Sequence, residues 1–298
     1  MIKKGLLRLA LLFLYLISLL PFCILYVISD VLFIVLYHII GYRRAVVQQN
    51  LLSSFPEKND AERRAIEKAY FKYLADLIIE TVKMISISKE ELQRRVVLTN
   101  PEIIERYVED NKSITAVAGH YCNWEWAGLE FGIESPLFFV YKPLSSQIFN
   151  DFFIRIRSRF GAVAVPMKQT MRTMVAHKNN FTVTVFAGDQ TPVQAEANYF
   201  IPFLNQPTAV FLGIEKIAKL IDSVVIFYDM QRTKRGYYSY TIVPLVENAK
   251  SSEQGEITKA HVKYLEMMIN REPQYWLWSH RRWKFKPETT QFDNACVK

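Results

Sequence analysis

The chain has 298 residues, a formal net charge of +8 at pH 7 and a hydrophobic content of 50%. This length is sufficient for one large α/β domain with a substantial core. A basic surface suits nucleic acid, an anionic membrane or an acidic protein equally, so charge alone excludes none of these partners. The three cysteines, Cys23, Cys122 and Cys296, are widely spaced and form no C-x-x-C pair, which argues against a zinc site and against a disulfide framework.

Residues 5–40 are almost entirely apolar, and residues 9–28 contain no charged side chain. An uncharged stretch of this length is a candidate membrane-spanning helix, and it lacks the small-x-small cleavage site that ends a signal peptide. We therefore predict that residues 1–45 form an uncleaved membrane anchor. Pro21 and Asp30 interrupt the segment and basic residues flank both ends, so a single span and a shallow re-entrant insertion both stay open.

Past the anchor, the sequence predicts one domain over residues 46–298. Residues 60–85 have helical periodicity, with Asp60 as the expected N-cap. Short apolar strand-like runs then alternate with helical segments, which favours an α/β fold with a mixed sheet flanked by helices. The last dozen residues are expected to form a loose tail. The expected strands are Ile114–Ala118, Leu137–Tyr141, Phe181–Ala187, Val224–Asp229 and Tyr237–Val243, and the expected helices are 124–132, 146–160, 168–178, 209–221 and 256–270.

The segment AGHYCNWEW, residues 118–126, joins an expected strand to an expected helix. We expect His120 in the loop before the helix, Asn123 as the N-cap and Glu125 in the first turn, where its carboxylate can reach back to the imidazole. A histidine titrates near neutrality and can take the proton of an attacking hydroxyl. A carboxylate partner fixes the tautomer and stabilises the imidazolium. His120 and Glu125 are therefore the predicted catalytic pair.

Other catalytic patterns are missing from the sequence. It contains neither a G-x-S-x-G nucleophile elbow nor an H-E-x-x-H zinc motif. We therefore expect no covalent acyl-enzyme of the hydrolase kind, no metal and no redox cofactor. An H-x4-E pair is common and usually structural, so its spacing alone does not establish catalysis.

Several further short blocks follow one another along the chain. They are Asn50-Leu51-Leu52 with Phe55-Pro56-Glu57, Gly119-His120 with Glu125, Tyr141-Lys142-Pro143, Arg157-Ser158-Arg159-Phe160-Gly161, Gly188-Asp189-Gln190, Phe200-Ile201-Pro202-Phe203 and Trp278-Ser279-His280-Arg281-Arg282-Trp283-Lys284. In this order the blocks resemble the lipid A biosynthesis acyltransferases, the late lauroyl and myristoyl transferases within the wider H-x4-D/E glycerolipid acyltransferase group. The ordered set is far more specific than any one block, and it covers nearly the whole chain from the anchor onward.

The resemblance implies a membrane-anchored O-acyltransferase whose catalytic domain spans residues 46–298. The implied reaction moves a fatty acyl chain from a thioester on acyl carrier protein to a hydroxyl of a lipid A precursor. His120 would be the general base and Glu125 its partner, and no cofactor would be needed. The resemblance also implies the cell inner membrane, with its lipids as further partners and the catalytic domain on the cytoplasmic face.

Polar residues of these blocks are candidate substrate-binding residues. On a helical wheel of residues 146–160, Arg159 lies nearest the apolar face and Arg157 farther from it, so Arg159 is expected to turn inward and clamp a phosphate or an oxyanion. A surface arginine is the alternative for both. Asp189 and Gln190 end a strand, where they can line a site or brace a loop. The full set of candidates is Arg159, Arg157, Lys142, Asp189, Gln190, Arg281 and Arg282.

The remaining aromatic residues of the catalytic block and two remaining histidines are expected to be structural. Trp124 and Trp126 flank Glu125 and could line an acyl groove, but core packing is the default for both. His177 and His261 lie on polar faces of their helices and are expected at the surface.

Three other functions fit parts of the pattern. An acyltransferase acting on another glycerophospholipid or an aminolipid would use the same pair, and a panel of acceptors distinguishes it. A catalytically inactive, membrane-tethered lipid-binding protein would tolerate replacement of His120. A nucleic-acid binder would show salt-sensitive binding, but no recognised binding module accompanies the basic residues, so we expect no nucleic-acid partner.

Overall fold

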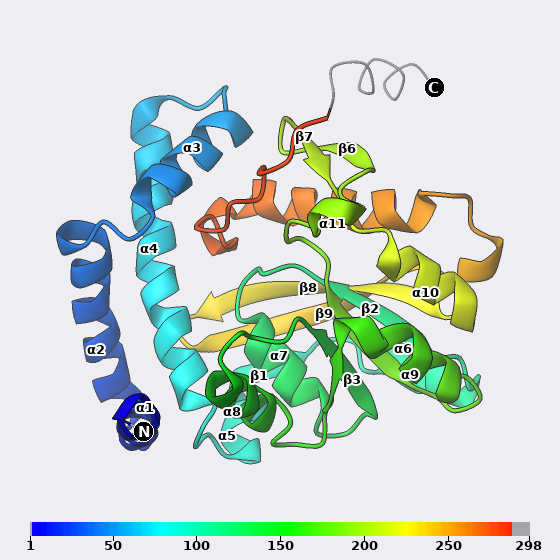
Figure 1. Cartoon of the computed structure of the whole chain (residues 1–298), viewed down its shortest axis with the longest axis horizontal. Helices are drawn as coiled ribbons and strands as arrows, with labels where there is room; N and C mark the ends of the chain where they lie inside the picture. The colour runs from blue at the N-terminus through cyan, green and yellow to red at the C-terminus, as the bar shows by residue number, and fades with distance from the viewer. Residues whose placement is uncertain (1, 288–298) are drawn as a thin grey trace.

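The computed structural model describes residues 2–287 and has a seven-stranded sheet at its centre (Figure 1). The strands of this sheet are β1 (Val96–Leu98), β2 (Ile114–Ala118), β3 (Leu137–Tyr141), β4 (Val163–Pro166), β5 (Val183–Ala187), β8 (Val224–Lys234) and β9 (Tyr237–Val246). Their order is β1-β9-β8-β2-β5-β3-β4, and only β8 and β9 pair antiparallel. A separate hairpin joins β6 (Phe200–Phe203) and β7 (Gln206–Ala209).

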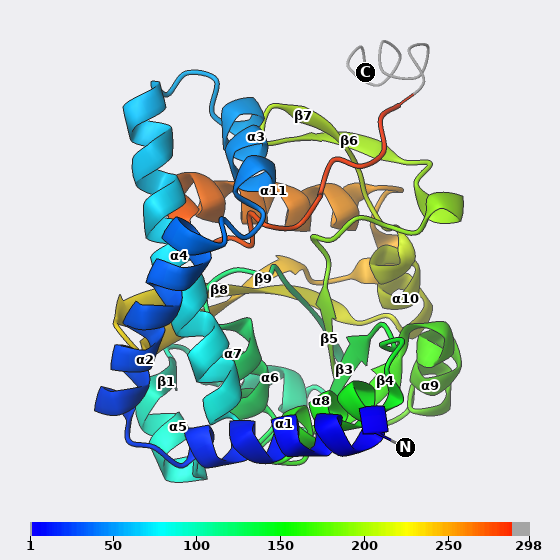
Figure 2. The same cartoon turned by 60° about the vertical axis from the view of Figure 1, so that its left-hand side comes forward.

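Helices cover both faces of the sheet. The α-helices of residues 2–287 are α1 (Ile2–Ser18), α2 (Phe22–Ile34), α3 (Arg44–Ser54), α4 (Asp60–Lys83), α5 (Lys89–Arg95), α6 (Glu102–Glu109), α7 (Trp124–Phe131), α8 (Gln147–Arg157), α9 (Thr170–Ala176), α10 (Gly213–Ile221) and α11 (Glu256–Arg271). In Figure 1 and Figure 2, α11 lies above the sheet, whereas α6, α7 and α8 lie below it. The predicted fold, a mixed sheet flanked by helices, is therefore confirmed.

The predicted elements match the structure best near the middle of the chain. The strands predicted at 114–118 and 137–141 coincide with β2 and β3. β5 begins at Val183, two residues later than predicted, and β8 and β9 continue past their predicted ends as one long hairpin. β1 and β4 were not predicted, because so few residues show no clear periodicity. The predicted tail lies almost entirely outside the described residues, as does Cys296.

The predicted N-cap of α4 was wrong by one residue. Asn59, and not Asp60, has the extended backbone of a cap, and its side chain accepts a hydrogen bond from the backbone N–H of Glu62 at 3.0 Å. The Glu62 side chain accepts from the backbone N–H of Asn59 in return, which completes a capping box. Asp60 instead lies in the first turn and pairs with Arg63 at 2.6 Å.

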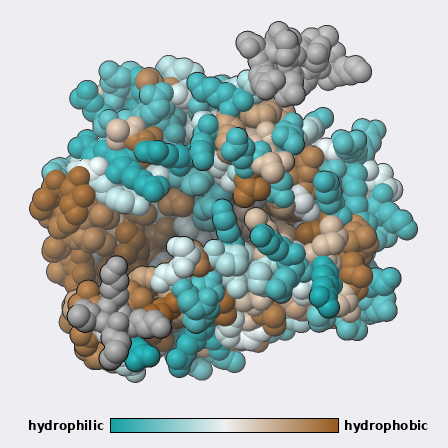
Figure 3. Space-filling model, viewed as in Figure 1, coloured by the Kyte–Doolittle hydropathy of each residue, from teal (hydrophilic) through white to brown (hydrophobic). Residues whose placement is uncertain are grey.

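The apolar N-terminal segment forms two helices that meet at an angle near Pro21. In Figure 2, α1 runs along the bottom of the molecule and α2 rises at the left. Residues Phe22–Ile39 have a mean hydropathy of 2.2 and are long and apolar enough to cross a membrane. Many large apolar side chains of α1 and α2 are exposed, and they contribute to the brown region at the left of Figure 3. We call them the apolar anchor surface: Leu6, Leu9, Leu12, Phe13, Leu16, Leu19, Ile24, Val27, Val31 and Ile34.

The opposite side of α2 packs against the rest of the protein through buried Leu25 and through several polar contacts. Ser29 donates to Asp76 of α4 at 2.7 Å, and Arg235, in the β8–β9 turn, pairs with Asp30 at 2.7 Å and with Asp76 at 2.6 Å. Asp30, the one acidic residue within the apolar segment, is therefore neutralised by the domain. The hydrogen bonds fix α2 against α4 and leave its other face for the apolar anchor surface.

Candidate active site

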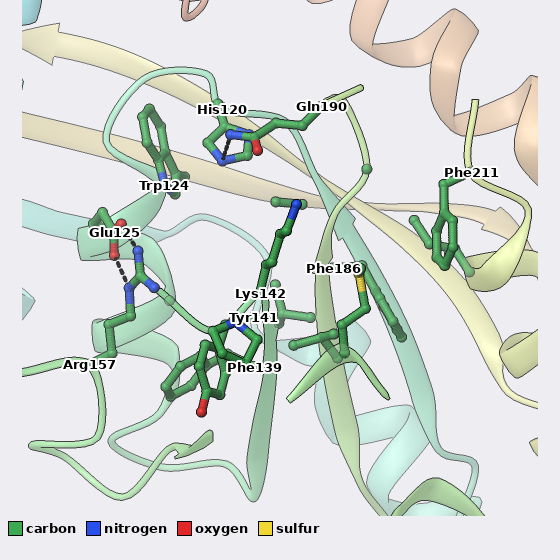
Figure 4. A pocket seen from close by; sticks show the side chains of 18 of the residues that line it. His120, Trp124, Glu125, Phe139, Tyr141, Lys142, Arg157, Phe186, Gln190 and Phe211 are labelled. Atoms are coloured by element: carbon green, nitrogen blue, oxygen red, sulfur yellow. Dashed lines mark hydrogen bonds and ion pairs between the residues drawn. The ribbon is translucent and has the colours of Figure 1, made fainter. Parts of the chain in front are cut away.

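A cavity of about 530 Å³ lies beyond the carboxyl ends of β2, β3 and β5 and extends between the sheet and α7 (Figure 4). Five of the predicted site residues line it, namely His120, Glu125, Lys142, Arg157 and Gln190. Much of the remaining lining is apolar, and includes Leu129, Leu137, Phe139, Met167, Val185 and Phe186. The cavity thus combines a polar opening with an apolar interior.

The residue that binds the His120 side chain is Asp189. Strands β2 and β5 are parallel neighbours, and Ala118 of β2 lies opposite Ala187 of β5. His120 and Asp189 each lie two residues beyond this pair. Asp189 Oδ1 lies 2.6 Å from His120 Nδ1, and Oδ2 accepts the backbone N–H of His120 at 2.8 Å. Because a carboxylate only accepts, Nδ1 carries the proton and Nε2 is left with its lone pair.

The C-terminal segment holds this pair in place. Trp276 donates its indole N–H to Asp189 Oδ2 at 2.8 Å, and Tyr121 and Trp276 form an antiparallel bridge. The backbone N–H of Leu277 donates to the carbonyl of His120 at 3.1 Å. Sequence reasoning missed Trp276, although it lies two residues before the recognised C-terminal block.

Two features of the 119–122 loop require this tight packing. A Cβ on Gly119 would lie 2.6 Å from Leu265 of α11, so only glycine allows α11 to approach the loop. Cys122 has a positive φ of 49°, a strained conformation for a residue with a side chain, and its backbone N–H donates to Tyr275 at 3.1 Å. Burial raises the pKa of the Cys122 thiol, so it is not a thiolate nucleophile.

The electrostatics of the pair raise the pKa of His120 and lower that of Asp189. Burial alone would lower the pKa of His120, but the charge and hydrogen bond of Asp189, together with the charge of Glu125, outweigh it and raise that pKa. Burial would raise the pKa of Asp189, yet His120 and the hydrogen bond from Trp276 hold it at about 2. Asp189 therefore stabilises an imidazolium whenever His120 takes a proton.

Gln190 lies next to the other ring nitrogen. Its Nε2 is 3.0 Å from His120 Nε2, at the cavity side of the ring (Figure 4). The ring nitrogen accepts this hydrogen bond, because Nδ1 already holds the proton. Trp124 contacts the ring from its edge, with 4.9 Å between ring centroids, and lines the cavity, whereas Trp126 is buried in the core as expected by default.

Glu125 faces the same cavity but does not make the contact expected from sequence. Its Oε2 accepts from Arg157 Nε at 2.7 Å and its Oε1 accepts from Arg157 Nη2. The expectation that Glu125 reaches back to the imidazole is therefore wrong. The guanidinium of Arg157 binds both carboxylate oxygens of Glu125, and His120 Nδ1 already donates to Asp189. The Arg157 charge lowers the pKa of Glu125 against the effect of burial, so the pair is ionised. A catalytic role for His120 and Glu125 stays a prediction.

Two other candidates, Arg159 and Arg281, do not line the cavity. Arg159 turns inward, but it donates to the backbone carbonyls of Met84 and of Ile87, the latter at 2.9 Å, so it connects α8 to the end of α4 and not to a ligand. Arg281 is exposed, and its carbonyl accepts from Thr191. Lys142, in contrast, is exposed at the cavity opening.

Arg282 is buried on the far side of Asp189. It lines a small space together with Asp189 and His261, and its Nε and Nη1 find no hydrogen-bond partner within residues 2–287. His261 was expected at the surface but is 3% exposed, because it lies on the largely apolar face of α11, between Ile257 and Leu265, that packs into the core. Burial lowers the pKa of Arg282 to about 10 and that of His261 to about 4.

Comparison with known proteins decides the family. A model of the bacterial lipid A biosynthesis acyltransferases matches residues 1–285. The chain belongs to this family. It is therefore an O-acyltransferase of lipid A biosynthesis, as the order of its sequence blocks predicted.

Three relatives illustrate how distant the similarity is. The chain is 23% identical to the lipid A biosynthesis palmitoleoyltransferase of Escherichia coli over 247 residues, 82% of this chain and 80% of the relative. It is 23% identical to the lauroyltransferase of the same organism over 250 residues, 83% and 80% of the two chains. A lipid A biosynthesis acyltransferase of Haemophilus influenzae is 23% identical over 268 residues, 89% and 83% of the two chains.

Proposed function

We propose that this acyltransferase moves a fatty acyl chain from an acyl carrier protein thioester to a hydroxyl of a lipid A precursor, with His120 as general base. The observation that supports this most is the His120 ring itself. Its Nδ1 is fixed by buried Asp189, and its Nε2 faces a cavity that is apolar inside. That arrangement suits a base that serves a lipid hydroxyl.

The proposed reaction has two steps. The acceptor hydroxyl oxygen attacks the thioester carbonyl carbon while its proton passes to His120 Nε2. The tetrahedral intermediate then expels the thiolate by breaking the C–S bond, and the imidazolium returns the proton to the sulfur. The products are an ester and the free thiol of the carrier. Asp189 stabilises the imidazolium between the two steps, as the raised pKa of His120 indicates.

Gln190, Arg157 and Lys142 are the proposed polar contacts of the substrates. The acceptor hydroxyl takes the position beside His120 Nε2 that the Gln190 amide now occupies. Glu125 holds Arg157 at the cavity wall, where the guanidinium can stabilise the oxyanion or bind a phosphate. Lys142 at the opening suits an anionic group of the acceptor.

We further propose that the apolar anchor surface inserts into the cytoplasmic face of the inner membrane. The fixed contacts of α2 with α4 and with the β8–β9 turn favour a shallow insertion over a span that separates from the domain. In that position the acceptor lipid reaches the cavity without leaving the bilayer surface.

The test is an acyl-transfer assay with the purified full chain, acyl carrier protein thioesters and a lipid A precursor, read by mass spectrometry. We expect the precursor to gain the mass of one acyl group. The His120→Ala variant should lose at least about 100-fold in rate, because it lacks the general base. An unchanged rate in that variant would contradict the proposal. Transfer to a glycerophospholipid or an aminolipid, and not to the precursor, would show that the proposed acceptor is wrong.

A further inference from the structure

Gly128 lies in the interior of α7 and lines the cavity. It follows Glu125 by three residues, so it lies on the same side of the helix, about 4.5 Å further along the axis. A Cβ built on Gly128 would meet no atom within 4 Å outside its own helical turn. The position therefore borders open space inside the cavity.

Neither the backbone nor the packing of the protein requires glycine at this position. The φ angle of Gly128 is not positive, and it lies within a regular helix, where glycine is less stable than alanine. The glycines nearby differ, because a Cβ on Gly132 would lie 3.2 Å from Ala162 and one on Gly188 would lie 3.0 Å from Ile214. Packing explains those two glycines and leaves Gly128 without a structural reason.

The open space at Gly128 continues the cavity away from His120. Helix α7 follows β2 and precedes the parallel strand β3, so it runs from the carboxyl edge of the sheet back toward its amino edge, and the cavity separates it from β3 and β5. Leu137 and Phe139 of β3 and Val185 of β5 line the cavity together with Gly128. Leu137 begins β3, so the apolar part of the cavity extends to the end of the sheet that is remote from the His120 ring.

We propose that Gly128 sets the length of the acyl chain that the cavity accepts, an inference that rests on the proposed function. The acyl carbonyl lies at His120, and the hydrocarbon runs down between α7 and the sheet. A side chain at position 128 would fill the volume that the far part of the chain needs, while the site around His120 stays intact. Gly128 is in this account a specificity-determining residue and takes no part in proton transfer.

The experiment compares the wild type with Gly128→Ala and Gly128→Met, using the purified full chain and saturated acyl carrier protein thioesters from octanoyl to stearoyl. Gly128→Met should shift the preferred donor to a shorter chain and lower kcat/KM for the preferred donor of the wild type by at least about tenfold. Gly128→Ala should shift the profile less. Thermal unfolding should show both variants folded, because the added atoms enter open space.

Gly5→Met is the matched control, since Gly5 also lies in a helix with nothing within 4 Å of an added Cβ but lies outside the cavity. It should keep the wild-type profile, and the same shift in this variant would overturn the inference. An unchanged profile in folded Gly128→Met, or equal loss with long and short donors, would also overturn it. No transfer from any donor by the wild type would overturn the proposed function together with the inference.

Discussion

The carboxylate that binds His120 comes from a neighbouring strand, and not from the neighbouring helix. His120 and Asp189 are 69 residues apart in sequence, yet each stands two positions beyond the facing residues Ala118 and Ala187 of parallel strands. The side chain of Glu125, five residues from His120, instead binds Arg157. Spacing along the chain therefore predicted that His120 and Glu125 lie close to one cavity but did not predict their hydrogen bonds.

Glu125 and Arg157 should behave as one unit. The charges of buried Glu125 and partly buried Arg157 compensate each other, so removing one leaves its partner without a counter-charge. We expect Glu125→Gln and Arg157→Gln to lower acyl transfer and stability singly, and the double variant to lose less than the sum. A double-mutant cycle on urea unfolding should give a coupling of about 0.5–3 kcal/mol. Additive losses would show that the two side chains act independently.

At the scale of elements, periodicity predicted what is regular and local. It located β2, β3 and α7, because their apolar residues follow the period of the element. It gave the wrong face for His261, since this residue lies among the apolar residues of the buried face of α11, four residues from Ile257 and from Leu265. It could not provide the pairing of β2 with β5 or the return of Trp276 to Asp189, because both depend on the path of the whole chain.

The attachment of α2 to the domain is a property of elements that can be tested. Arg235 binds both Asp30 of α2 and buried Asp76 of α4. Arg235→Gln should increase amide hydrogen exchange across α2 and reduce the free energy of unfolding by about 1–3 kcal/mol, because Asp76 loses a charged donor. Hydrogen exchange of the protein in detergent, read by mass spectrometry, measures the change in α2.

The control is Arg94→Gln, because Arg94 is an exposed arginine on α5 that pairs with Glu91 of the same helix. It should leave the exchange of α2 unchanged, as surface ion pairs contribute little. Unchanged exchange of α2 in the Arg235 variant would show that other contacts hold the helix.

At the scale of the molecule, three distant parts of the chain form one site. The N-terminal helices provide the apolar anchor surface, the middle of the chain provides the cavity, and the C-terminal segment braces His120 and Asp189. The resemblance of the ordered blocks predicted the family, because those blocks meet around the cavity or support it. It did not separate residues that face the cavity, such as Gln190, from those that support it, such as Arg282.

The most direct test of the account is the pH dependence of kcat/KM for acyl transfer by the wild type, Asp189→Asn and Glu125→Gln. Since Asp189 raises the pKa of His120, kcat/KM of the wild type should rise with pH, and the midpoint of this limb should lie above the ordinary pKa of histidine. Asp189→Asn should lower the plateau at least about 100-fold and move that limb to lower pH. Glu125→Gln should shift the limb less, whereas the exposed control Asp222→Asn should leave it in place. The account would be contradicted if Glu125→Gln moved the midpoint of the limb further than Asp189→Asn did, while Asp189→Asn kept the wild-type plateau of kcat/KM.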